Sequence, residues 1–433
     1  MPRFGSSGIR GLANVDVTAD LALQVGKVLG ELCGASVIGR DPRTTGPLLA
    51  SALAAGLMSA GADAIDGGVV TTPTLARAAS EYKCGIVVTA SHNPAPYNGI
   101  KLWNPDGMAF DETQQTEVEA ALDAGHFRAA AWDTVGRLTA REDLVDRHAE
   151  AVLRDAGTAD LHVVVDCGCG ATATITPRVL REMGCDVLAI NAQPDGRFPG
   201  RDPEPTEENL AFLRTTVRAA GADLGIAHDG DGDRMVAVDS EGRFVGGDRL
   251  LPLFARREAR QAIVVPVDAS MALEDLLPGV KVWRTRVGDV YVAQELKRRR
   301  ADFGAEPSGT WIFPSSSLCP DGVYAAARLV AMVAERPLAE QLADVPAYPA
   351  VRGSVSYEPA KRSGIEARLV RALRDLGAEV TETDGWRLRF DAGWALVRFS
   401  GTEPKIRIVS EARDEAVAKE IYGRVLSSAQ GAV

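Results

Sequence analysis

The chain has 433 residues, of which 46% are hydrophobic and 25% are charged, and its formal net charge is −11. This length predicts several domains, and the composition is that of an ordinary soluble globular protein. The acidic balance argues against nucleic-acid binding, which usually needs a basic face, but it still allows a small phosphorylated substrate held by local arginines.

Strand-like and helix-like segments alternate through most of the chain. The strand-like segment 35–41 precedes a helix-like segment at 46–62, and the pattern continues through 62–70, 72–82 and 84–94. It restarts at 161–190 and again at 261–277. This β-α-β-α order predicts mixed or parallel sheets covered by helices, and three such units predict three related mixed α/β domains.

The last part of the chain has a different pattern. Segments 351–360 and 378–412 read as strands joined by hairpin-like turns, and segment 414–429 reads as one helix. We expect a C-terminal α+β domain, in which an antiparallel sheet carries a helix on one side. The proline-rich segment 336–350 is interpreted as the linker into it. The expected domains are 1–145, 146–247, 248–347 and 348–433.

Neither a membrane span nor a cysteine metal site is indicated. No apolar run reaches the roughly 18 residues that a membrane span needs, and the N-terminus lacks an apolar core of secretory length. The six cysteines include the Cys167-x-Cys169 pair, but no further metal ligands stand out beside it. We therefore expect a cytoplasmic protein with unpaired, structural thiols.

The stretch from Val88 to Gly107 begins as an apolar strand and then reads Thr-Ala-Ser-His-Asn-Pro. Loops that follow strands are where α/β proteins place reactive groups, and a serine hydroxyl beside a base is a plausible nucleophile. Ser91 with His92 is therefore a candidate. Serine and Asn-Pro also favour turns by themselves, so a purely structural turn remains an equal alternative.

A second motif, at 228–239, alternates aspartate with glycine. Asp229, Asp231 and Asp233 would repel one another unless a cation lay among them, and the glycines allow the backbone to turn all three inward. An EF-hand is excluded, because Arg234 and Ser240 occupy the positions that require glycine and glutamate. Oxygen ligands in so small a set favour Mg²⁺. The alternative is a solvated acidic turn, which the flanking apolar strands argue against.

Two further loops combine polar groups that suit a sugar phosphate. In the segment 304–313, Glu306 and Ser308 could bind sugar hydroxyls, although an ordinary turn is the favoured interpretation of that segment alone. The segment 398–407 combines turn hydroxyls and backbone N–H groups with arginine side chains, a combination that suits a phosphate clamp. Its candidate residues are Arg398, Ser400, Gly401, Thr402 and Arg407, and no carboxylate except Glu403 is expected to compete for the arginines. A hairpin turn with exposed arginines is the alternative for this segment alone. Together, the four motifs indicate phosphoryl transfer on a phosphorylated polyol.

On these residues the chain resembles the α-D-phosphohexomutase family over essentially its whole length. The resemblance rests on five motifs in family order: FGSSGIRG (4–11), TASHNP (89–94), DGDGDR (229–234), GAEPSGT (304–310) and RFSGTEP (398–404). Segment 194–210 also looks like the family's linker before its metal-bearing unit. The resemblance implies four domains around a central cleft, and an enzyme that acts as a monomer or homodimer.

The resemblance also implies a mechanism. Ser91 would be a phosphoserine that holds Mg²⁺ together with Asp229, Asp231 and Asp233. The enzyme would convert a hexose 6-phosphate and a hexose 1-phosphate into one another through a hexose 1,6-bisphosphate, which would also serve as activator. Three positions match groups implicated in proton transfer, namely Lys101, His92 and Arg10. Three more match substrate contacts, namely Arg234, Gly288 and Asp289.

The family resemblance does not decide the sugar. Thr310 stands where many members carry a histidine. The FGSSGIRG and VGDVYV forms are most similar to the family's archaeal glucosamine-specific members, so glucosamine phosphate is the first expectation. Mannose or glucose phosphate is the alternative. Two more distant alternatives are a phosphatase with an aspartate nucleophile in DGDGD, and a sugar-phosphate sensor without activity.

Overall fold

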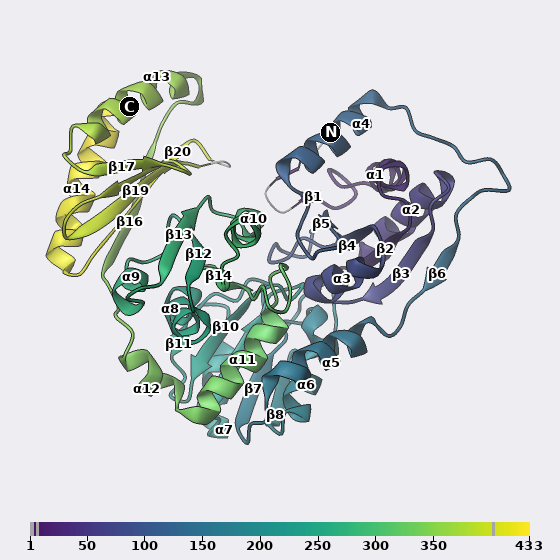
Figure 1. Ribbon diagram of the computed structural model, residues 1–433, viewed down its shortest axis with the longest axis horizontal. Helices are drawn as coiled ribbons and strands as arrows, with labels where there is room; N and C mark the ends of the chain where they lie inside the picture. The colour runs from purple at the N-terminus through teal and green to yellow at the C-terminus, as the bar shows by residue number, and fades with distance from the viewer. Residues whose placement is uncertain (1–3, 6–7, 401–402) are drawn as a thin grey trace.

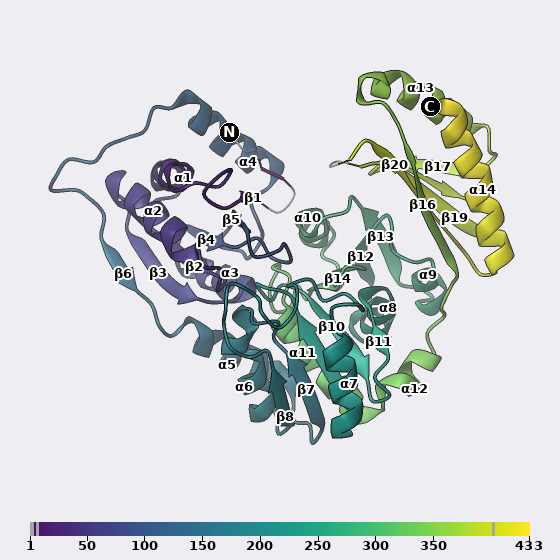
Figure 2. The same ribbon diagram turned by 180° about the vertical axis from the view of Figure 1, so that it is seen from behind.

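Each β-sheet of the protein is built from one consecutive part of the chain. The computed structural model describes residues 4–5, 8–400 and 403–433. Figures 1 and 2 show the four sheet-based parts arranged in an arc, with the first and the fourth part at its two ends. In the described residues, no helix has both the length and the apolar character needed to cross a membrane.

The first sheet has mixed strand directions, as expected. Its order is β1-β5-β4-β2-β3-β6, and β5 runs antiparallel to both of its neighbours. Helices α1, α2 and α4 pack on one face, and α3 packs on the other. The elements are β1 Ile9–Leu12, α1 Ala19–Leu32, β2 Ser36–Arg40, α2 Gly46–Ser59, β3 Ala64–Val69, α3 Thr72–Ala78, β4 Cys84–Val88, β5 Tyr97–Trp103, α4 Glu112–Ala124 and β6 Leu138–Ala140.

The second and third sheets share a hydrophobic core, in which the long helix α11 packs against α5 and α6. Their strand orders are β11-β10-β9-β7-β8 and β13-β12-β14-β15. The second sheet comes with α5 Leu144–Ala156, β7 His162–Asp166, α6 Thr176–Glu182, β8 Asp186–Ile190, α7 Ala211–Ala220, β9 Leu224–His228, β10 Met235–Asp239 and β11 Phe244–Val245. The third comes with α8 Gly247–Glu258, β12 Ala262–Pro266, α9 Ala272–Leu276, β13 Lys281–Thr285, α10 Asp289–Arg299, β14 Phe303–Glu306, β15 Thr310–Ile312, α11 Gly322–Glu335 and α12 Leu338–Ala343.

The fourth sheet is antiparallel throughout, in the order β16-β20-β19-β18-β17. Its elements are β16 Ala350–Ser356, α13 Arg362–Arg374, β17 Glu379–Glu382, β18 Trp386–Arg389, β19 Gly393–Phe399, β20 Lys405–Ala412 and α14 Glu415–Ala432. Three α/β parts and one antiparallel α+β part confirm the expected fold class. We retain the boundaries at 145, 247 and 347 as a proposal.

Two segments contain helices that the sequence analysis did not predict. The expectation of one C-terminal helix was wrong, because α13 buries Ile365, Leu369 and Leu373, a stripe spaced four residues apart. The linker segment 336–350 contains α12, which is anchored by the buried Leu338. The Gln341 side chain there also donates to the Met332 and Arg336 carbonyl oxygens.

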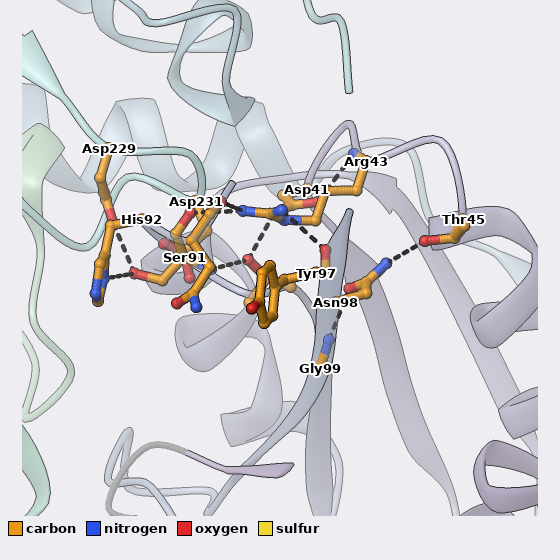
Figure 3. A network of polar contacts seen from close by, with 12 residues as sticks. Asp41, Arg43, Thr45, Ser91, His92, Tyr97, Asn98, Gly99, Asp229 and Asp231 are labelled. Carbon is orange, nitrogen blue, oxygen red and sulfur yellow. Dashed lines mark hydrogen bonds and ion pairs between the residues drawn. The ribbon is translucent and has the colours of Figure 1, made fainter. Parts of the chain in front are cut away.

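The loop between β4 and β5, which carries Ser91, is held in place by Arg43. This guanidinium is fully buried, and its Nε donates to Asp41 Oδ2 at 2.9 Å. Its two Nη atoms donate to four backbone carbonyl oxygens of the loop, those of Ser91, Asn93, Pro94 and Tyr97. Figure 3 shows this arrangement, in which one side chain fixes the course of the loop.

Replacing Arg43 is therefore expected to destabilise the first domain. Arg43→Met leaves four carbonyls and the Asp41 carboxylate without their partner, and removing one member of a buried ion pair costs about 3–5 kcal/mol. We expect the melting temperature of the purified protein to fall by at least ~5 °C. Arg154→Met, on the exposed side of α5, serves as the control and should melt like the unsubstituted protein. Equal melting of both variants would contradict this role.

Candidate active site

Ser91 lies in the loop after β4 with its backbone in the left-handed region, at a φ of 52°. Such a φ is uncommon for a residue other than glycine and is often found at functional sites. The side chain is buried, and its hydroxyl donates to Asp229 Oδ2 at 2.7 Å. The same Oγ lies 3.3 Å from His92 Nδ1. The loop therefore places the Ser91 hydroxyl next to the aspartate-rich segment of the second domain (Figure 3).

Asp229, Asp231 and Asp233 lie in the tight connection between β9 and β10 and are all buried, as the flanking apolar strands predicted. Each offers an oxygen within 4.8 Å of the other two. Both glycines between them are required by the geometry. Gly232 has a φ of 75°, and a Cβ at Gly230 would come within 2.6 Å of the Ser91 carbonyl oxygen.

The three carboxylates differ in charge environment. Burial and repulsion from Asp233 and Asp231 hold the pKa of Asp229 well above its ordinary value. Burial also disfavours ionisation of Asp231, but the Lys101 ammonium outweighs it and lowers the pKa of Asp231. Lys101, from β5, donates to both Asp231 Oδ2 and Asp233 Oδ2 at 2.8 Å. The Thr72 hydroxyl donates to Asp231 Oδ2 at 2.6 Å.

The donor set fits a divalent cation. Asp231 Oδ1 and Asp233 Oδ1 are buried without any hydrogen-bond partner, and such groups are rare unless a ligand completes them. Lys101 supplies one positive charge against three carboxylates. Hard oxygen ligands in this number are typical of Mg²⁺ sites, in which water and phosphate complete the coordination. Among the described residues, these three are the only such cluster of potential metal ligands.

A cavity of about 280 Å³ lies beside Ser91 and is lined by residues of the first three domains. Nine residues predicted from the sequence line it: Arg10, Ser91, His92, Asp233, Arg234, Gly288, Asp289, Glu306 and Ser308. Lys101, Asp229 and Asp231 are buried and do not line it. A larger cavity of 860 Å³ near α3 and α5 contains none of the predicted residues in its lining, so size alone does not identify the site.

The cavity has cationic groups close to Ser91. Arg10 donates to Asn93 Oδ1 at 3.3 Å, and Arg234 follows the aspartate motif. Burial, together with the charges of Arg234, Arg10 and Lys101, lowers the pKa of His92 to about 3, which leaves its imidazole neutral at pH 7. These side chains are suited to hold an anionic phosphate next to the serine.

The opposite side of the cavity belongs to the third domain and is acidic. Glu306, in β14, accepts a hydrogen bond from the Gly288 backbone N–H at 2.7 Å. Burial and the nearby Asp289 raise the pKa of Glu306 to about 8. The Ser308 hydroxyl lies 3.2 Å from Thr310 Oγ1. Carboxylate and hydroxyl groups in this arrangement are suited to bind sugar hydroxyls.

The predicted phosphate clamp is only partly covered by the structure, and its described residues Arg398, Ser400 and Arg407 do not line the cavity. Gly401 and Thr402 lie outside the described residues. Arg407 is exposed and pairs with Glu403, whereas Arg398 pairs with Asp384 at 2.9 Å. Glu403 is thus not the only carboxylate competing for these arginines, because Asp384, in the turn between β17 and β18, approaches Arg398 from outside the motif.

Several residues of the site were not found from the sequence, namely Arg43, Thr72 and Asp268. Arg43 and Thr72 act through buried contacts with loops far away in the chain, and Asp268 lines the cavity from the segment after β12. The only local signal was the helix-start pattern at 71–74, where the Thr71 side chain caps α3.

Comparisons with known proteins identify the family of the chain. Four models of the phosphoglucomutase/phosphomannomutase family match in order: alpha/beta/alpha domain I at 1–129, domain II at 144–242, domain III at 246–348 and the C-terminal domain at 330–427. Proteins described as probable phosphoglucosamine mutases are also similar. That of Methanosarcina acetivorans is 51% identical, with 98% of this chain and 97% of the relative covered, and that of Methanococcoides burtonii is 50% identical, with 96% of each covered.

A solved structure supports the same assignment. The phosphoglucomutase/phosphomannomutase family protein of Burkholderia thailandensis superposes with a TM-score of 0.87 at 29% identity, covering 99% of this chain and 97% of the other. The family resemblance that the motifs predicted is confirmed. The chain belongs to the phosphoglucomutase/phosphomannomutase family of isomerases.

Proposed function

We propose that this enzyme converts hexose 6-phosphate and hexose 1-phosphate into one another through a phosphorylated Ser91 and a hexose 1,6-bisphosphate, with glucosamine phosphate as preferred substrate. The observation that carries the proposal is the position of Ser91. Its hydroxyl donates a hydrogen bond to Asp229 of the buried aspartate triad. Ser91 also lines the cavity that Glu306 and Ser308 line from the third domain.

The proposed reaction consists of two phosphoryl transfers. In the first, the bond between phosphorus and the Ser91 oxygen breaks, a bond to a sugar hydroxyl oxygen forms, and the hydroxyl proton passes to a base. In the second, the bond between phosphorus and the other sugar oxygen breaks, a bond to the Ser91 oxygen forms again, and the proton held by the base passes to the freed sugar oxygen, so that the sum is an isomerisation. Lys101, His92 and Arg10 remain the predicted groups for proton movement and charge stabilisation.

The remaining predicted residues are assigned by the part of the substrate that they would bind. The aspartate triad would hold Mg²⁺, which when bound neutralises charge on the transferring phosphoryl group. Arg234, Gly288, Asp289, Glu306 and Ser308 would contact the sugar. The C-terminal loop with Arg398, Ser400, Gly401, Thr402 and Arg407 would bind the phosphate that is not being transferred. A hexose 1,6-bisphosphate would prime the serine.

Glucosamine is proposed because the relatives with about half of their residues identical are described as probable phosphoglucosamine mutases. Activity on mannose or glucose phosphate is the alternative, since the matching family models cover both.

A side-by-side assay tests the sugar. Purified protein with Mg²⁺ and a catalytic amount of bisphosphate is given the 1-phosphates of glucosamine, glucose and mannose. We expect kcat/KM for glucosamine phosphate to exceed the other two by about tenfold or more. A mannose or glucose rate tens of times above that for glucosamine would overturn the sugar assignment but leave the mutase reaction standing.

Removing the Ser91 hydroxyl tests the phosphate carrier. Ser91→Ala is expected to lower mutase turnover by at least about a thousandfold, because no other group can hold the phosphoryl between the two transfers. Mass spectrometry should detect phosphate on the unsubstituted chain, after incubation with bisphosphate, and none on the variant. Ser80→Ala, an exposed hydroxyl, is the control. Retained turnover in Ser91→Ala would favour the aspartate-nucleophile alternative.

The metal assignment has a test that does not depend on activity. Mg²⁺ added after chelation should raise the melting temperature of the unsubstituted protein, since it binds the folded triad and relieves the repulsion there. We expect Asp233→Asn to lose this shift, whereas Asp186→Asn, exposed on β8, keeps it. An unchanged shift in Asp233→Asn would place the cation elsewhere.

A further inference from the structure

Asp268 is a carboxylate in the active-site cavity that no predicted role accounts for. It lies in the segment between β12 and α9 and lines the cavity together with Glu306 and Ser308. Its Oδ1 atom is buried and has no hydrogen-bond partner. A buried carboxylate oxygen without a partner is costly, so it indicates a group that a ligand completes.

The backbone around Asp268 is firmly held. Arg284 Nη1 donates to the Ala269 carbonyl oxygen at 2.7 Å, and its Nη2 donates to that of Ser270 at 3.1 Å. The preceding Val267 is buried in an apolar cluster with Trp394 and Leu396 of the fourth domain. The position of Asp268 at the cavity is therefore set by packing on both sides and does not depend on a free loop.

Three carboxylates face the cavity from the third domain, namely Asp268, Asp289 and Glu306. Burial raises the pKa of each of them, and for Glu306 the two neighbouring carboxylates add to the effect. The positive side chains of the lining, Arg10 and Arg234, belong instead to the first two domains. The cavity thus has a positive side next to Ser91 and a side lined by carboxyl groups where the sugar ring would lie, and a cationic group bound there would favour the ionised form of these carboxyls.

We propose that Asp268 accepts a hydrogen bond from the ammonium group of an aminohexose phosphate and so selects amino sugars over sugars that carry a hydroxyl at that carbon. This inference rests on the proposed function, because it takes the cavity to be the sugar site of a mutase. A carboxylate accepts hydrogen bonds from hydroxyl and ammonium alike, but only the ammonium adds a Coulomb attraction between opposite charges. A second carboxyl group beside Glu306 therefore favours the amino sugar.

A competing role for Asp268 is an ion pair with Arg398 across the boundary between the third and fourth domains. Among the nearby cations, Arg398 contributes most to lowering the pKa of Asp268, and the Arg398 Nε is buried without a partner. However, the Arg398 guanidinium is already paired with Asp384. The two roles differ in what they predict. A domain-pairing role affects every sugar equally, whereas an ammonium-binding role affects amino sugars alone.

The experiment compares Asp268→Asn with the unsubstituted enzyme on glucosamine 1-phosphate and glucose 1-phosphate. Asparagine keeps the size of the side chain, removes its charge and replaces one acceptor oxygen by an NH2 donor. We expect kcat/KM for the glucosamine substrate to fall at least about tenfold, while that for the glucose substrate changes less than about threefold. Asp275→Asn, outside the cavity in α9, makes the same change in net charge and should leave the ratio unchanged.

Two further measurements separate the possible failures. Calorimetry gives the dissociation constant of each sugar 6-phosphate for the dephosphorylated enzyme. In Asp268→Asn this constant should rise for glucosamine 6-phosphate only. Asp268→Ser is a second variant in case the amide does not fold, and melting curves check both. Equal losses on both sugars, or an unchanged ratio, would overturn the inference and leave the proposed function intact. The absence of mutase activity in the unsubstituted enzyme would overturn the proposed function itself.

Discussion

Three buried carboxylates with oxygens within 4.8 Å of one another are the constraint on which the rest of the active site depends. In a medium of low polarity their repulsion is large, so each needs a fixed positive or hydrogen-bonding neighbour. Lys101 supplies the charge from β5, and Thr72 supplies a hydroxyl from the start of α3. The first domain must therefore be docked correctly on the second for the aspartate motif to be tolerated at all.

The same motif connects three domains through its backbone. The Asp231 carbonyl oxygen accepts from the Thr72 N–H, and the Gly232 carbonyl oxygen accepts from the Gly322 N–H at the start of α11. Behind Thr72, a buried chain of contacts runs from Thr74 through His148 to Asp321, which caps α11. The aspartate motif is thus held, through its side chains and its backbone, by elements far apart in sequence. These contacts fix the positions of the serine and the aspartates relative to one another.

The sequence analysis identified what is encoded in short contiguous patterns. The alternation of aspartate with glycine, the strand-to-loop change at Ser91 and the order of strands and helices are all local signals, and the structure reproduces them. The hydrogen bonds from Arg43 to four carbonyl oxygens had no such local signal. They depend on how the end of β2 packs against the β4–β5 loop, which is a tertiary contact. The pairing of Arg398 with Asp384 depends in the same way on the strand register of the fourth sheet. Helix α13 differs, because its apolar spacing of Ile365, Leu369 and Leu373 is present in the sequence itself.

The difference between local sequence patterns and tertiary contacts also separates the chemistry of the phosphate from the choice of sugar. Phosphoryl transfer needs several oxygen and nitrogen ligands at short, fixed distances, and one glycine-rich loop can supply most of them, so the residues stay together in sequence. A sugar ring is larger and is contacted around its edge by single residues from separate elements. The residues that we propose for these contacts come from the segment after β12, the start of α10 and the end of β14. Each of these is a single polar residue in a separate element, and of the three only Asp268 was not named from the sequence. The reaction class can therefore be read from the sequence, whereas in the proposed function the discrimination among sugars depends on the tertiary arrangement of the third domain.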